Sequence, residues 1–167
     1  DKANPSATVV ETQNPTATPV FSEGLKYRLN SSETGYIVEG IGSCNDETVI
    51  LPDTYQNLPV TTIDKSAVSC QTSFKTFIIP DSVTSIGECA FDRCTNLESV
   101  TIPNNVTAIS GRTFMDCTSL ESVTIGNSVV SINSYAFMGC TSLKNITIPN
   151  SVTYIKHSAF RDCTSLE

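Results

Sequence analysis

The side chains that could carry out acid–base or nucleophilic chemistry are few and scattered in this 167-residue chain. His157 is its one histidine, and a Ser-His-Asp or Cys-His site needs a nucleophile and an orienting acid beside the imidazole in a cleft. Glu98 and Glu121 are the candidates for a glycosidase carboxylate pair, but Lys144 continues their 23-residue spacing. We expect that row to be a solvated rim, and we predict no catalytic residue and no enzyme activity.

The seven cysteines offer disulfide or metal chemistry, which their spacing does not favour. Zinc sites use C-x-x-C pairs or mixed Cys/His clusters, and neither pattern occurs. Four cysteines instead recur every 23 residues, at Cys94, Cys117, Cys140 and Cys163. Three states remain open: a ladder of reduced structural thiols, one disulfide, or a metal site. The spacing favours the first, with Cys44 and Cys70 as divergent members of the ladder and Cys89 as the one exposed and reactive thiol.

The same period organises the second half of the chain. The unit reads CTNLESVTIPNNVTAISGRTFMD over 94–116, CTSLESVTIGNSVVSINSYAFMG over 117–139 and CTSLKNITIPNSVTYIKHSAFRD over 140–162, with a partial copy at 163–167. Two weaker copies precede it at 44–69 and 70–93, the first with a five-residue insertion at 53–57. A period between about 20 and 50 residues is typical of solenoids, whose units bury their apolar columns only when stacked.

Each unit predicts a short parallel strand, a turn and a second extended piece. In the third copy, residues 99–102 alternate polar and apolar, as in a strand with one inward face. Pro103 ends that strand because proline cannot donate to the ladder. Residues 106–109 form the second piece, and a stretch such as 87–93 is predicted as a helical turn with its Phe inward. The fold class is therefore an α/β repeat solenoid of about five coils over 44–167.

The region before the coils divides into two parts. Residues 1–24 have the Thr-, Pro- and Asn-rich composition of a flexible spacer. Residues 25–43 contain two alternating segments around SSETG, which predicts a β-hairpin that caps the first coil. No matching cap follows the last coil, so we expect that coil to fray or to pair end to end with another copy.

Charge and hydropathy restrict the partners. The net charge of −7 disfavours nucleic acid as a partner, and no apolar stretch is long enough to span a membrane. The chain starts at Asp1 with a Thr/Pro-rich segment, which suits a processed protein tethered to a cell surface; an arbitrary boundary is the alternative.

A ladder of small polar residues is the candidate ligand surface. The outward positions of the predicted strands are Thr76, Ile78, Ser99, Thr101, Ser122, Thr124, Asn145 and Thr147. Many modest hydrogen bonds from such a face suit a protein or glycan ligand. The alternative is that Ser and Thr are simply compatible with exposed strands.

The unit resembles the BspA-like leucine-rich repeat, also called the Treponema pallidum type. Departures are modest: Gly126 stands for Pro, Thr113 for Ala and Val68 for Phe. The resemblance implies a right-handed leucine-rich-repeat coil without cofactor or catalytic residues. It also implies a secreted or surface-anchored protein, such as a lipoprotein, of a host-associated microbe. We therefore expect an adhesin-like binding module for a host or microbial protein or glycan. The alternative is a rigid spacer that displays a further domain beyond residue 167.

Overall fold

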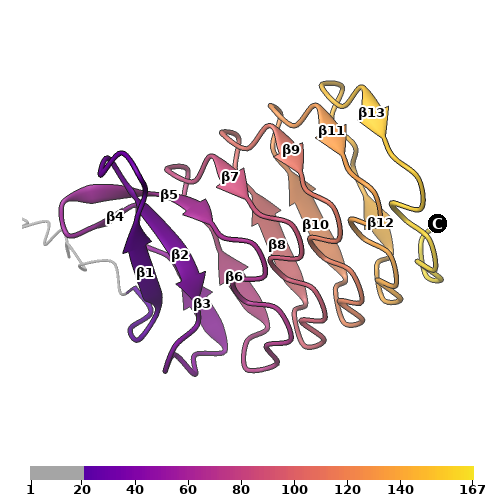
Figure 1. Cartoon of the computed structure of the whole chain (residues 1–167). Helices are drawn as coiled ribbons and strands as arrows, with labels where there is room; N and C mark the ends of the chain where they lie inside the picture. The colour runs from indigo at the N-terminus through magenta and orange to yellow at the C-terminus, as the bar shows by residue number, and fades with distance from the viewer. Residues whose placement is uncertain (1–20) are drawn as a thin grey trace, which may run out of the picture.

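The computed structural model describes residues 21–167, and these wind into a solenoid whose coils lie side by side along the chain (Figure 1). The predicted repeat coil, with one short strand of each unit stacked in parallel, is confirmed. Residues 1–20 of the predicted spacer lie outside the described residues. Ser22, near the end of that segment, donates its amide to the Ile50 carbonyl at 3.0 Å in the first coil.

The first strand of every coil joins one parallel sheet. Its order is β12-β10-β8-β6-β3, with β3 at Thr48–Ile50, β6 at Thr76–Ile78, β8 at Ser99–Ile102, β10 at Ser122–Ile125 and β12 at Asn145–Ile146. The register places equivalent residues of successive coils opposite each other, as in Ser99↔Ser122 and Val100↔Val123. The column of Phe77, Val100 and Val123 and the column of Ile79, Ile102 and Ile125 are buried, so each coil covers the apolar side of its neighbour.

The second extended piece of each unit also stacks in parallel. These strands are β5 at Leu58–Ile63, β7 at Ser85–Ile86, β9 at Ala108–Ile109, β11 at Ser131–Ile132 and β13 at Tyr154–Ile155. β9, β11 and β13 form a three-stranded sheet, whereas β7 pairs with β5 in the sheet of the N-terminal end.

The predicted hairpin caps the first coil. β1 (Lys26–Leu29) and β2 (Tyr36–Gly40) pair antiparallel, and β2 then pairs parallel with β5. Asn30 holds the connecting loop, since its Oδ1 accepts the Thr34 amide at 2.9 Å. The cap thus continues the second sheet and covers the end of the stack.

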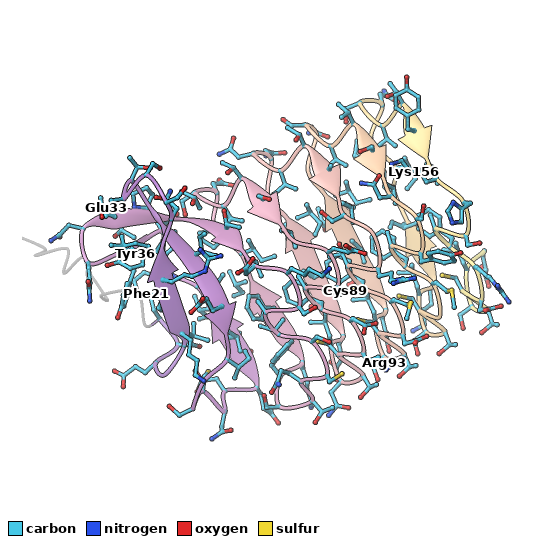
Figure 2. The ribbon with its side chains drawn as sticks, viewed as in Figure 1. Phe21, Glu33, Tyr36, Cys89, Arg93 and Lys156 are labelled. Atoms are coloured by element: carbon cyan, nitrogen blue, oxygen red, sulfur yellow. The ribbon has the colours of Figure 1, made fainter. Side chains whose placement is uncertain are left out.

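The five-residue insertion forms a second hairpin that the sequence did not predict. β4 (Thr54–Tyr55) pairs antiparallel with the start of β5, and the two loop residues Gln56 and Asn57 have φ of 47° and 66°, as a type I′ turn requires. The ring of Tyr55 stacks on Tyr27 at 4.2 Å between centroids. The Tyr36 hydroxyl, labelled in Figure 2, donates to Gln56 Oε1 at 2.7 Å.

The segment predicted as a helical turn is instead a series of tight turns, and residues 21–167 contain no helix. Cys89 and Arg93 both have φ of 57°, which interrupts a right-handed helix. Alternate amides bond within the turn and to the next coil: Ala90 N donates to Gly87 O at 3.3 Å, and Phe91 N to Thr113 O at 2.9 Å. The segment therefore links neighbouring coils, which a helix could not do through its own bonded amides.

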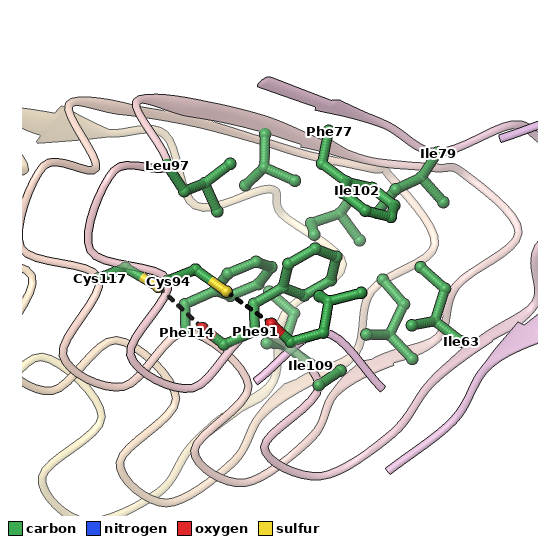
Figure 3. Close-up of a cluster of buried hydrophobic side chains, with 14 of the residues drawn as sticks. Ile63, Phe77, Ile79, Phe91, Cys94, Leu97, Ile102, Ile109, Phe114 and Cys117 are labelled. Carbon is green, nitrogen blue, oxygen red and sulfur yellow. Dashed lines mark hydrogen bonds between the residues drawn. The ribbon is translucent and has the colours of Figure 1, made fainter. Parts of the chain in front are cut away.

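A column of phenylalanines fills the interior. Phe91, Phe114 and Phe137 are fully buried. Ring centroids from Phe91 to Phe160 are 5.2, 5.4 and 5.3 Å apart, with interplanar angles of 19°, 8° and 5°. Figure 3 shows the first two of these rings beside the cysteine column. Such contacts couple the packing of each coil to the next.

Candidate functional site

The four cysteines of the 23-residue column each donate to a backbone carbonyl 26 residues earlier, at the turn stacked beneath their own. Their Sγ atoms lie 3.1 Å from backbone carbonyl oxygens, in the pairs Cys94–Val68, Cys117–Phe91, Cys140–Phe114 and Cys163–Phe137. Figure 3 draws the first two as dashed lines. All seven cysteines are free thiols within residues 21–167. The column thus adds side-chain donors to the backbone amides that join the turns of successive coils.

Burial keeps these thiols protonated. It raises the pKa of Cys94 to about 12 and the pKa of Cys117 well above the ordinary range. A thiolate is both the nucleophile and the metal ligand, so the raised pKa disfavours both roles for Cys94 and Cys117 near neutral pH. Over residues 21–167, no group of three or more His, Cys, Asp or Glu side chains is placed to hold a metal ion.

The prediction that Cys89 is the one exposed cysteine is wrong. Cys70 is exposed, whereas Cys89 is half-buried. Burial, and then the carboxylates of Glu88 and Asp92, raise the pKa of Cys89, so that thiol is not activated. Cys70 occupies the solvent-facing turn position of Arg93, with φ of 60° against 57°. A one-residue offset, visible in the sequence, carries it out of the buried column.

His157 has no catalytic surroundings. Its Nδ1 lies 3.1 Å from Ser134 Oγ, and its ring meets Tyr135 edge-on at 4.8 Å. No carboxylate in the described part of the chain bonds to the imidazole.

Glu121 pairs with Lys144 at 2.9 Å and Glu98 with Lys75 at 4.0 Å. These carboxylates form an exposed row of ion pairs along the strand sheet.

The structure brings all eight predicted ligand-facing residues to one side of the main sheet, which we call the strand face: Thr76, Ile78, Ser99, Thr101, Ser122, Thr124, Asn145 and Thr147. Seven lie within β6, β8, β10 and β12, and Thr147 follows β12 directly. Thr101, Thr124 and Thr147 are exposed. The parallel register sets them in rows along the solenoid.

The strand face is hollowed where β6 meets β8. The two strands pair only at Thr76↔Ser99 and Phe77↔Val100, whereas β8 and β10 pair at four positions. A depression of about 370 Å³ lies at this opening. Ile78 lines it and is 46% exposed. The repeat pattern marked Ile78 as an outward residue in a column of threonines, but the opening of the ladder could not be read from it.

No helix in residues 21–167 has the length and apolar character that crossing a membrane would take. No curated protein matches the chain. Among solved structures, the leucine-rich repeat protein of T. pallidum is 31% identical with a TM-score of 0.82, over 88% of this chain and 68% of that one. A leucine-rich repeat protein from Bacteroides ovatus is 32% identical with a TM-score of 0.77, over 89% of this chain and 40% of that one.

A leucine-rich cell surface protein from Faecalibacterium prausnitzii is 25% identical with a TM-score of 0.51, over 89% of this chain and 53% of that one. The family model for the BspA type leucine-rich repeat region matches residues 61–167 in six copies. Its span coincides with the stacked coils from β5 onward. The chain therefore belongs to the BspA type leucine-rich repeat family.

Proposed function

We propose that the chain is a non-enzymatic, cell-surface or secreted binding module whose strand face contacts a host or microbial protein or glycan. Leucine-rich repeat proteins generally bind partners through an extended face and leave catalysis to other folds. One structural relative is described as a cell surface protein. The family and this relative support the location and the class of function.

The observation that carries the proposal is the composition of the strand face. Its outward rows consist of hydroxyl and amide side chains without charge, from Thr76 to Thr147. Ile78 and the depression beside it add an apolar contact near the middle of the sheet. An uncharged surface of hydrogen-bonding groups with one exposed apolar side chain, Ile78, resembles the centre of a protein interface more than a typical solvent-exposed surface. The ion pairs of Glu98 and Glu121 border it as a polar rim.

The proposal is tested with an array of purified extracellular-matrix proteins and mammalian glycans. Ligands that capture the chain are re-measured with Thr124→Arg and Thr101→Arg, which place a long cation on the strand face. Thr107→Arg is the matched control, since Thr107 is exposed immediately before β9, in the second sheet.

We expect each strand-face variant to weaken binding by roughly tenfold or more, since an uncomplementary buried charge at an interface costs at least that much, and the control to bind normally. Equal binding by all variants would overturn the strand face as the ligand surface. Absence of any captured ligand would favour the rigid-spacer role instead.

We also infer that the last coil can contact a second copy of the chain. Tyr154 and Ile155 of β13 are 69% and 52% exposed, although the column of Ile155 is buried at Ile109 and Ile132. β12 and β13 each have one neighbour in their sheets within the described residues. An apolar edge with free backbone groups favours pairing with another strand.

A further inference from the structure

We propose that a hollow on the turn side of the solenoid, away from the strand face, binds a saccharide that carries a carboxylate or sulfate group. The hollow measures about 360 Å³ and is lined by Arg112, Asn133, Ser134, Tyr135 and Lys156, with Glu88 at one side. They come from four successive coils, since Glu88, Arg112, Tyr135 and Lys156 follow β7, β9, β11 and β13. Lys156, labelled in Figure 2, directly follows β13 near the C-terminal end of the stack.

The first argument is the distribution of cations. Within residues 44–167, Lys65, Lys75, Arg93, Lys144 and Arg161 each pair with a carboxylate. Arg112 and Lys156 are the two cations of the coils without an ion pair among the described residues, and both line this hollow. In a chain with a net charge of −7, two unpaired cations at one concave place provide a local site for an anion.

The second argument is the backbone. Arg112 and Tyr135 have φ of 56° and 61°, in a column where Ser66 and Ser158 adopt the same conformation with small side chains. Left-handed backbone is costly for bulky residues. The coil needs the conformation but not the large side chains, which project over the hollow: the Arg112 guanidinium lies 5.6 Å from the centre of the Tyr135 ring.

The third argument is the set of polar groups, which suits a sugar. Asn133 Nδ2 donates to Ile109 O at 3.0 Å, which fixes the orientation of the amide, and its Oδ1 is an acceptor for a hydroxyl. Ser134 Oγ can donate or accept beside His157. An arginine fork pairs with carboxylate or sulfate oxygens, and the Tyr135 ring beneath the Arg112 guanidinium supports it by a cation–π contact. The volume lies at the lower end of small-ligand sites.

Glu88 beside the hollow, and Asp92 near Arg112, bear the charges that oppose an anion here. Glu88 Oε2 lies 3.5 Å from Lys65 Nζ, and this neighbour offsets part of its charge. The anionic group of the ligand is therefore assigned to the Arg112 and Lys156 side, and the neutral hydroxyls to the Glu88 side.

The test is an NMR titration of the backbone amides with sialyllactose, sulfated lactose, neutral lactose and a hexaglutamate peptide. We expect shifts at the amides of Asn133, Ser134 and Tyr135 with one or both acidic sugars, and none with lactose. Comparison of sialyllactose, which carries a carboxylate, with sulfated lactose shows which anionic group the site prefers. Arg112→Gln and Lys156→Gln should each weaken binding by roughly tenfold, the size of one charge-assisted hydrogen bond.

Lys144→Gln is the matched control, because Lys144 is an exposed cation paired with Glu121, and it should bind normally. Thermal unfolding verifies that all three exposed substitutions leave the fold intact. Binding of hexaglutamate as strong as that of the sugars, shifts unaffected by the two Gln variants, or no shifts with any probe would overturn the site. Shifts confined to Thr101 and Thr124 would overturn it while supporting the strand face as the ligand surface.

Discussion

The sulfur of Cys117 lies 3.1 Å from the carbonyl oxygen of Phe91, 26 residues earlier in the chain. The same oxygen accepts the Cys94 amide, three residues after Phe91, at 3.2 Å. Both acceptor positions of one buried carbonyl are thus used, one for closing a turn and one for joining two coils. A cysteine at this point is a hydrogen-bond donor small enough to fit a fully buried position.

Cys117→Ala should therefore destabilise the fold by about 1 to 3 kcal/mol, through the lost hydrogen bond and the cavity left by the sulfur. Urea unfolding measures the change in the free energy of unfolding. Cys70→Ala is the control, and because Cys70 is exposed it should change stability by less than about 0.5 kcal/mol. Equal effects of the two substitutions would contradict the structural role of the column.

Stability should fall in alkaline solution because of the buried thiols. The pKa of Cys94 is raised from 9.0 to about 12 in the folded chain, so the unfolded chain loses this proton first. The contribution is fully present below about pH 9 and is lost as pH rises toward 12, with a slope of up to about 1.4 kcal/mol per pH unit for each such thiol. Urea titrations at a series of pH values across this range measure the free energy of unfolding. That free energy should fall less steeply with pH for Cys94→Ala than for the unchanged protein. Identical slopes would show that Cys94 is not desolvated as described.

Gly126 should not tolerate a side chain, although Pro80, Pro103 and Pro149 occupy its column. A Cβ at Gly126 would lie 2.5 Å from the Pro103 carbonyl oxygen, so Gly126→Ala should cost about 1 to 3 kcal/mol through overpacking.

Gly111→Ala is the comparison for this glycine, because its Cβ would lie 3.4 Å from the nearest atom, Ser134 O. That substitution should be neutral or stabilise by up to about 1 kcal/mol. Thermal or urea unfolding of both variants checks the difference. A stable Gly126→Ala variant would mean that the coils at Pro103 and Gly126 are spaced more widely.

The 167-residue chain should self-associate at high concentration through Tyr154 and Ile155, which expose large apolar side chains at the last strand. Multi-angle light scattering over a concentration series should show a rising mass, and the double substitution Tyr154→Lys with Ile155→Lys should abolish the rise. Val130→Lys changes an apolar residue that is 46% exposed in an interior coil and should leave association intact. A constant monomer mass for the unchanged chain refutes the contact between copies.

The 23-residue period predicted the stacked columns because each apolar residue recurs in the same place. Phe91, Phe114 and Phe137 are a core column for that reason. The period could not predict the backbone conformation at Cys89 and Arg112, since the left-handed turn there is imposed by bonds to the next coil rather than by the residue type. A helix was expected because 87–93 lacks β-branched residues, and that composition does not distinguish a helix from successive turns.

The candidate surfaces were predictable to different degrees. The strand face follows from strict alternation, which fixes the direction of Thr101 and Thr124 once the strand is placed. The turn-side hollow does not, because Arg112, Ser134 and Lys156 lie in different columns and meet only through the stacking of three coils. His157 is exposed, as a lone histidine on a repeat is expected to be, but its contacts with Ser134 and Tyr135 could not be read from the repeat.

Each cysteine bond reaches back 26 residues, and the main strand ladder of the later coils joins positions 23 apart. Deletion of residues 117–139 would leave Cys140 facing the carbonyl of Phe91 and would bring Phe160 behind Phe114, so the same residue types would meet at the new junction. Duplication of that segment would do the reverse and lengthen the rod by about 4.8 Å, one strand spacing. The length of the molecule is therefore adjustable in whole units, by recombination, without any new interface having to evolve.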